Sequence, residues 1–236
     1  MNLLLVKADQ IGPDGIFTAT AEQSEHIACI LHAQKGDRIK AGVFGGKIGL
    51  AELVEPSKKQ AKLKILSLDR EPPQKKNLRF VIALPRPQSF KKCLHFLASA
   101  GIPEACFIQT ARVEKSYWNS AGMTAEAIEK EIFLGLEQGV DTIPPQLHFF
   151  PSFRDWKDSE FCRDFSGRRL IAHPVNAVPC PVSMTDPALV AIGPEGGFIP
   201  RELEVFRELG FECVELGSYI LRVEFALAYI CGRLTP

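Results

Sequence analysis

The sequence predicts an α/β fold in which a small β-rich domain, residues 1–70, precedes a larger α/β domain, residues 71–236. Three observations support this prediction. Residues 1–70 hold short runs of alternating apolar and polar residues separated by glycine turns. Residues 69–77, DREPPQKKN, are charged and rich in proline, which is typical of a linker. From Leu78 onward, short apolar runs alternate with amphipathic runs, which indicates a mainly parallel sheet.

The predicted strands of the first domain lie in two stretches. Residues 36–55, GDRIKAGVFGGKIGLAELVE, alternate loosely on either side of a turn at Gly45 and Gly46. Residues 59–68, KQAKLKILSL, alternate lysine with leucine or isoleucine, as a half-buried strand does. One short helix is expected near residues 21–31. Several short strands with one helix favour a small barrel.

The second domain is predicted to hold strands and helices in turn. Ser89 is a suitable N-cap, Thr124 can cap a long helix, and Pro200 suits the first turn of a helix that Gly210 ends. The predicted strands are 79–84, 105–110, 169–173, 189–193 and 212–216, and the predicted helices are 89–101, 124–136, 200–209 and 221–231.

Composition excludes several classes of protein. The 236 residues are 46% hydrophobic and 24% charged, which is ordinary for a globular protein. No apolar run approaches the roughly 20 residues that span a bilayer, and the N-terminus MNLLLVKADQ does not resemble a signal peptide. The seven cysteines are scattered and form no CxxC pair. We therefore expect a cytoplasmic protein with reduced thiols, no metal site and no membrane partner.

Charge is divided unevenly along the chain. Residues 1–118 hold 18 Lys and Arg against 11 Asp and Glu, a net charge of +7, whereas residues 119–236 hold 10 against 17, a net charge of −7. A basic half favours a polyanionic partner. The alternative is that these charges only form a solvated surface, and the charge distribution alone favours this alternative over a polyanionic partner.

The glycine-rich stretch IGPEGGF, residues 192–198, follows a predicted buried strand. Ligands of α/β sheets bind beyond the carboxyl ends of strands, and glycine lets backbone approach a ligand closely. The stretch lacks the Gly-Lys-Ser/Thr of a phosphate-binding P-loop and the spacing of a dinucleotide fingerprint. LIAHP (170–174) and ELGSYILR (215–222) also end predicted strands. We expect the three strand-end loops to line one pocket.

These motifs resemble a known family. IGPEGGF, followed about twenty residues later by LGSYILRVE, is similar to the SPOUT superfamily of knotted methyltransferases, and within it to the 16S ribosomal RNA (uracil-N3)-methyltransferase family. HIACILHAQKGDRI, ALPRP, ARVEKSYW, GLEQ and AHP fall in that family's order. The resemblance covers nearly the whole chain.

The resemblance implies a fold and a cofactor. It implies a PUA-like β-barrel that binds RNA in residues 1–70, and in residues 71–236 a methyltransferase domain with a deep trefoil knot. It also implies a homodimer packed through the knot region, whose last helix is rich in apolar residues. The cofactor is S-adenosylmethionine, and carry-over assigns to it His173, Pro174, Ile192, Gly193, Glu195, Gly196, Gly197, Leu216, Gly217, Ile220, Leu221 and Glu224.

The implied reaction is methylation of uridine N3 in 16S ribosomal RNA of the small subunit. Arg222 is the candidate for stabilising negative charge on the uracil, and the alternative is an ordinary ion pair with Glu224. Glu137 and Gln138 match the family's Glu-Gln pair and either reach the substrate or brace the knot. Glu195 either bonds a ribose hydroxyl or caps the next helix.

RNA docking is predicted for a basic and aromatic set of residues, because cations bind phosphates while aromatic rings stack on bases. The plainer interpretation of its tryptophan is a core residue. The set is Arg86, Lys91, Lys92, Arg112, Lys115, Tyr117 and Trp118.

Three positions depart from the family pattern. Ser218-Tyr219 stand where the family usually has Pro-Arg, and Phe225 stands where it tends to have Thr. These departures keep two alternatives open: a knotted methyltransferase acting on another RNA or on ribose, and a ribosome-assembly factor that binds RNA without transferring methyl groups.

Overall fold

The computed structural model describes residues 1–235; Pro236, which ends the second predicted domain, lies outside the described residues. The chain forms two compact units. Unit 1 consists of Met1–Gln74, Ala98–Gly101 and Ile132–Pro144, and unit 2 consists of Lys75–Leu97, Ile102–Glu131 and Pro145–Pro236. Nothing in the sequence pattern indicated the two short segments that return to unit 1. The assignment of an RNA-binding domain and a methyltransferase domain to residues 1–70 and 71–236 stays a prediction.

Unit 1 is built on a five-stranded sheet of mainly antiparallel strands. Its order is β1 (Leu4–Val6), β3 (Arg38–Val43), β4 (Ile48–Glu55), β5 (Lys62–Arg70) and β2 (Ile16–Thr18), and only β1 and β3 pair in parallel. The turn predicted at Gly45 joins β3 to β4, and Gly45 has a φ of +75°. The predicted helix is α1 (Ala21–Cys29), two residues shorter than expected. Closure of this sheet into a barrel stays a prediction.

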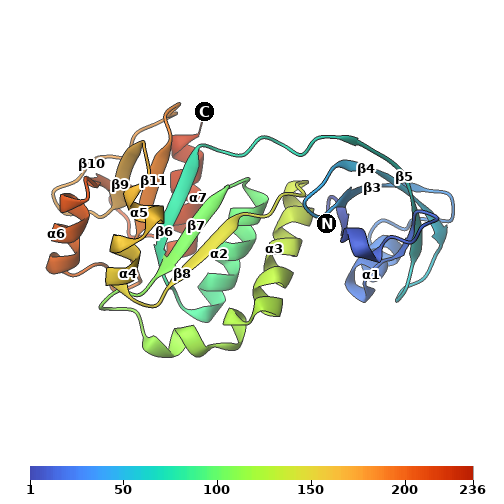
Figure 1. Cartoon of the computed structure of the whole chain (residues 1–236), viewed down its shortest axis with the longest axis horizontal. Coiled ribbons are helices and arrows are strands. Elements are labelled where there is room, and N and C mark those ends of the chain that lie inside the picture. Colours follow the sequence, from blue (N-terminus) through green and yellow to red (C-terminus); the bar gives the residue numbers. More distant parts are fainter. Residues whose placement is uncertain (236) are drawn as a thin grey trace. The chain divides into compact units, whose positions relative to one another are not determined.

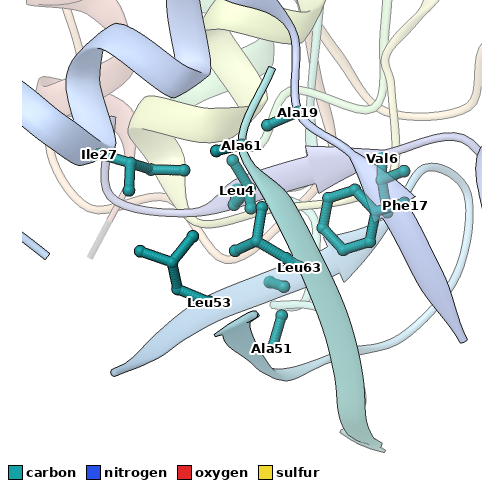
Figure 2. Close-up of a cluster of buried hydrophobic side chains, with 10 residues drawn as sticks. Leu4, Val6, Phe17, Ala19, Ile27, Ala51, Leu53, Ala61 and Leu63 are labelled. Carbon is teal, nitrogen blue, oxygen red and sulfur yellow. The ribbon is translucent and has the colours of Figure 1, made fainter. Parts of the chain in front are cut away.

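The core of unit 1 lies between α1 and the sheet (Figure 2). Leu4 from β1, Phe17 from β2, Leu53 from β4 and Leu63 from β5 are almost fully buried there, together with Ile27 of α1. Along β5, buried Leu63 lies between exposed Lys62 and Lys64. The alternation that predicted a half-buried strand is thereby confirmed.

Unit 2 contains a seven-stranded sheet in which every pairing is parallel, as predicted. Its order is β10 (Val178–Pro179), β12 (Glu212–Glu215), β9 (Arg168–Ala172), β11 (Ala188–Ile192), β6 (Leu78–Ala83), β7 (Glu104–Ile108) and β8 (Gln146–Phe150). The central strand β11 is buried along its whole length, which explains its uninterrupted apolar sequence ALVAI.

Helices cover both faces of this sheet; in Figure 1, α4 (Phe153–Asp158) and α5 (Glu160–Arg163) lie in front of it and α2 (Pro87–Ser99) lies behind it. The other helices are α3 (Ala125–Gly139), α6 (Pro200–Glu208) and α7 (Val223–Leu234). Strands β8 and β10 and helices α4 and α5 were missed. Residues 146–165 are so rich in aromatic side chains that neither a helical nor a strand period stands out.

Helix α7 begins two residues later than predicted. Arg222 has extended backbone, with φ −66° and ψ 156°, so the loop before the helix includes Leu221 and Arg222. Leu227 and Ile230 of α7 are buried within unit 2, whereas Phe225 and Tyr229 are exposed. Among residues 1–235, no helix has the length and apolar character to cross a membrane.

Candidate functional site

The three strand-end loops predicted to meet do meet. Strands β12, β9 and β11 are neighbours in the sheet, and the loops that follow their carboxyl ends line one cavity of about 340 Å³. We call it the loop cavity. It is lined by Ala172–Pro174, Ile192–Phe198 and Val214–Leu221, with Val223, Ala226 and Arg112. The parallel sheet explains the convergence, since all three strands end at the same edge.

Eleven of the twelve residues predicted to bind a cofactor line the loop cavity; they are His173, Pro174, Ile192, Gly193, Glu195, Gly196, Gly197, Leu216, Gly217, Ile220 and Leu221. The twelfth, Glu224, is not among the lining residues. It is buried on α7 and holds an ion pair with Lys92, with 3.2 Å between Nζ and Oε1. Burial alone raises the pKa of Glu224, but hydrogen bonds from its own backbone, Ser89 and Lys92 outweigh burial and lower the pKa overall.

The glycine-rich loop after β11 is anchored by an aromatic cluster. Phe198 at its end packs on Phe206 of α6, with 4.8 Å between ring centroids. A Cβ on Gly193 would lie 3.1 Å from the Phe198 ring, so glycine there lets the loop fold back on itself. Gly197 has a φ of +71°, in the left-handed region that glycine adopts at little cost. The loop thereby presents backbone to the cavity.

Arg112 lies across the glycine-rich loop. Its Nη1 donates a hydrogen bond to the Gly196 carbonyl, and a Cβ on Gly196 would lie 3.1 Å from the Arg112 side chain. Buried Glu202 holds the loop that carries Arg112: its Oε1 accepts from the Ala111 N–H at 2.7 Å, and its Oε2 accepts from the Ile199 N–H at 3.0 Å. Arg112, predicted for RNA docking, therefore lines the loop cavity.

Charged groups of both signs border the loop cavity. Arg112 is its cationic side chain, and Glu195 and Glu215 are its carboxylates. Burial lowers the pKa of His173, which favours the neutral imidazole. The remaining lining is largely apolar side chain and backbone, as is usual for a small-molecule site.

A second cavity, of about 540 Å³, adjoins the first. It is lined by Arg86, Pro87, Gln88, Ser89, Tyr117, Glu195 and Arg222, and we call it the Arg222 cavity. Glu195 lines both cavities. Its Oε1 accepts from the Arg86 N–H at 3.3 Å and lies 3.9 Å from Arg86 Nε. Glu195 therefore does not cap α6, because Glu202 bonds the first residue before that helix instead.

The exposed guanidinium of Arg222 is free for a ligand. Within residues 1–235 it has no hydrogen-bond or ion-pair partner, and the ion pair with Glu224 that composition suggested does not form, because Glu224 pairs with Lys92. Arg222 lies at the cavity because the extended backbone before α7 carries its side chain there.

Glu137 and Gln138, the other predicted catalytic residues, belong to unit 1 and line neither cavity. Glu137 Oε1 accepts from Gln23 Nε2 at 2.7 Å and from the Leu5 N–H at 3.2 Å. Burial raises the pKa of Glu137, and these two hydrogen bonds partly offset the shift. The Gln138 carbonyl accepts from Asn2. These contacts of Glu137 lie within unit 1, and the two roles left open, reaching the substrate or bracing the knot, stay predictions.

The residues predicted for RNA docking are only partly grouped. Lys91 is ion-paired with Glu131 at 3.7 Å, and Lys115 is exposed. Trp118 is half-buried in a 3-10 helix (Lys115–Asn119) and donates through Nε1 to Gln109 at 2.6 Å, so it is not a core residue. Arg86 and Tyr117 line the Arg222 cavity.

Sequence reasoning missed two residues that shape this region. Glu202 stands three residues after Ile199 at the start of α6, the position from which a glutamate commonly bonds the helix N-terminus, and this signal was available. Gln109 fixes the next loop by donating to the carbonyls of Thr110 and Val113, both at 2.8 Å, and no pattern marks it. Residues 1–235 contain no cluster of His, Cys, Asp or Glu suited to a metal ion.

Comparisons with known proteins agree on one family. Residues 72–235 match the family model described as an RNA methyltransferase domain. Ribosomal RNA small subunit methyltransferase E of Treponema pallidum is 27% identical over 98% of this chain and 90% of its own length. Ribosomal RNA small subunit methyltransferase E 1 of Borreliella burgdorferi is 26% identical over 96% of this chain and 94% of its own length.

A solved structure shares the fold. Ribosomal RNA small subunit methyltransferase E from Neisseria gonorrhoeae, bound to S-adenosylmethionine, superposes with a TM-score of 0.69 at 20% identity. The match covers 97% of this chain and 96% of that one. The shared fold therefore extends over both units.

Proposed function

The chain belongs to the RNA methyltransferase family, and from this premise we propose that it transfers a methyl group from S-adenosylmethionine to N3 of a uridine in small-subunit ribosomal RNA. One observation carries the proposal: three strand-end loops of the family-matching region converge on a single glycine-lined cavity. The names of the Treponema and Borreliella relatives support the choice of RNA.

The loop cavity fits S-adenosylmethionine. Apolar side chains such as Ile192 and Leu216 suit the adenine, and the glycine-rich backbone offers amides and carbonyls close to a ligand. The amino-acid end of the cofactor carries one carboxylate and two positive charges, on nitrogen and sulfur. We propose that Arg112 pairs with the carboxylate, and that Glu195 and Glu215 provide negative potential for the positive charges.

Methylation at N3 requires that this atom is accessible and that it loses its proton. N3 lies on the pairing edge of the base, so the target must be unpaired or flipped out. N3 is also protonated at neutral pH, so the negative charge that develops as its proton leaves needs stabilisation. The bound cofactor supplies an activated methyl group. Arg222, which has no side-chain partner among the described residues 1–235, is proposed to stabilise the uracil oxygens.

The test is direct. We expect the purified chain, given S-adenosylmethionine with an isotope-labelled methyl group and small subunits from a strain lacking this methylation, to add one methyl group to a single uridine. Mass spectrometry of the digested RNA should find 3-methyluridine. A labelled methyl group on ribose, or on another base, would contradict the proposed reaction and favour one of its alternatives.

The cofactor contact of Arg112 has its own test. Arg112→Gln should weaken the binding of S-adenosylhomocysteine by about 10- to 100-fold, because a charge-assisted hydrogen bond contributes roughly 1.5–3 kcal/mol to affinity. 5′-Methylthioadenosine lacks the amino-acid end, so its affinity should change by less than about twofold. Calorimetry with both ligands measures the difference. Equal losses for both ligands would mean that Arg112 only braces the Gly196 loop.

We also propose that unit 2 contains a trefoil knot and that unit 1 is a PUA-like RNA-binding barrel. The knot is supported by the chain path. Strand β12 follows β11 in the sequence but pairs with β9, on the far side of β9 from β11. The loop after β12 then returns to the loops after β9 and β11 at one cavity. The barrel is supported by the five-stranded sheet with its single α-helix. A cytoplasmic location is part of the same proposal.

A homodimer is proposed through the loop after β12 and the outer face of α7. Tyr219 and Ile220 are 85% and 94% exposed, and Phe225 and Tyr229, one helical turn apart, are exposed beside Arg222 and Leu221. Apolar side chains exposed in one stretch mark a protein contact. Sedimentation velocity at micromolar concentration should give a single species of twice 26.1 kDa. Ile220→Glu should shift it toward the monomer; a monomeric unmodified chain would contradict the proposal.

A further inference from the structure

The two cavities lie along one edge of the unit 2 sheet. The loop cavity is formed beyond β12, β9 and β11, and the Arg222 cavity is lined by segments that follow β11, β6 and β7, together with the loop before α7. Strand β11 contributes to both through Glu195. A ligand in the Arg222 cavity can therefore contact one in the loop cavity, with the Glu195 carboxylate at their shared border.

The lining of the Arg222 cavity matches a nucleotide. It provides two guanidinium groups, one phenol ring, one hydroxyl and one amide, from Arg86, Arg222, Tyr117, Ser89 and Gln88. Guanidinium groups bind phosphate and carbonyl oxygens, an aromatic ring stacks on a base, and an amide both donates to and accepts from a base edge. The volume of about 540 Å³ is within the range of small-ligand sites.

The cationic side chains of the cavity are only lightly engaged within the protein. The Arg86 backbone N–H donates to Glu195 at 3.3 Å, while the exposed Arg86 guanidinium lies 3.9 Å from the same carboxylate and interacts with the Tyr117 hydroxyl. The Arg222 guanidinium has no partner within residues 1–235. A cavity with one unpaired and one weakly paired guanidinium is suited to an anionic or carbonyl-bearing ligand.

We propose that the Arg222 cavity holds the target nucleotide of the RNA, flipped out of its strand, with the base between Tyr117 and Arg222. The inference rests on the proposed function and adds the location of the methyl acceptor. The cavity adjoins the loop cavity, so a base held there would lie next to a cofactor bound in the loop cavity. Gln88 and Ser89 determine which base edge fits, and Arg86 binds the phosphate.

Gln88 allows a sharp test, because it is exposed at the start of α2 and its side chain can be enlarged without removing a core contact. Gln88→Trp should fill the cavity and lower methyl transfer at saturating small subunits by at least about 100-fold, since small displacements of the reacting base cost that much. Its affinity for S-adenosylmethionine should stay within about twofold. Glu208→Trp places the same bulky side chain at an exposed position of α6 outside both cavities, so this matched control should retain the normal rate.

A second measurement uses the unmodified protein, so that the inference can be tested even if Gln88→Trp fails to fold. Small-subunit RNA containing 4-thiouridine is irradiated on the unmodified protein loaded with S-adenosylhomocysteine, and we expect the crosslink of the methyl-accepting uridine at Tyr117, Gln88 or Arg222. Crosslinks elsewhere, or a Gln88→Trp protein that methylates at the normal rate, would overturn the inference. Failure of the unmodified protein to bind cofactor or to methylate any subunit RNA would instead refute the proposed function, and with it the inference that rests on it.

Discussion

Arg222→Ala should lower the rate of methyl transfer by about 100- to 1,000-fold while leaving cofactor affinity nearly unchanged, because removal of one preorganised charge-stabilising donor has an effect of that size. The side chain lines the Arg222 cavity, and the Glu224–Lys92 ion pair beside it does not depend on it. The fold should therefore survive the change. Single-turnover rates with saturating small subunits measure the effect on chemistry.

Two further measurements separate charge stabilisation from simple binding. Arg222→Lys should recover only part of the rate, since lysine cannot present a planar pair of donors. Raising the pH should partly rescue Arg222→Ala, because more of the uracil is then already ionised at N3. A variant that binds RNA poorly yet turns over normally at saturating RNA would identify Arg222 as a phosphate clamp.

Gly197→Val should abolish measurable cofactor binding. Gly197 has a φ of +71°, which a β-branched residue adopts only as a strained outlier, so valine forces the glycine-rich loop into another conformation. The space itself is open, since the nearest atom to an added Cβ is Arg112 Nη1 at 3.9 Å. The loss therefore comes from the backbone of the loop. Calorimetry with S-adenosylmethionine checks it.

Gly210 provides the matched control. It ends α6 with a φ of +81°, and the nearest atom to an added Cβ is Arg169 Cδ at 4.0 Å, so valine there meets similar backbone strain outside both cavities. Gly210→Val should lower thermal stability and still bind the cofactor. If both variants lose binding equally, the effect of Gly197→Val is general destabilisation and its assignment to the site is wrong.

The parts of the site that could be predicted depend on local signals. A buried parallel strand gives an apolar run, and a loop that approaches a ligand gives glycine, so the ends of β9, β11 and β12 could be found one by one. Their convergence followed from the rule that parallel strands end at one edge. Resemblance supplied the residue assignments, and eleven of them line one cavity.

The parts that could not be predicted depend on contacts distant in sequence. Arg112 reaches Gly196 across 84 positions, and Glu202 reaches Ala111 across 91. Arg112 stands among lysine and aromatic residues that suggest an RNA surface, and composition cannot indicate which of these turns inward. Glu224 likewise stands two residues from Arg222, yet its partner is Lys92, 132 positions away.

Unit 1 has a consequence for the order in which the chain is made. Leu5 and Gln23 donate to the Glu137 carboxylate, and Asn2 and Leu3 donate to its backbone carbonyl. All four donors leave the ribosome more than a hundred residues before their acceptor. The strands of the N-terminal sheet are all made by residue 70, and β1 can pair with β3, but the four contacts to Glu137 can form only after helix α3 has been synthesised. Unit 1 therefore begins the chain but is complete only once residues 132–144 have been made, still before strands β9, β11 and β12 of unit 2.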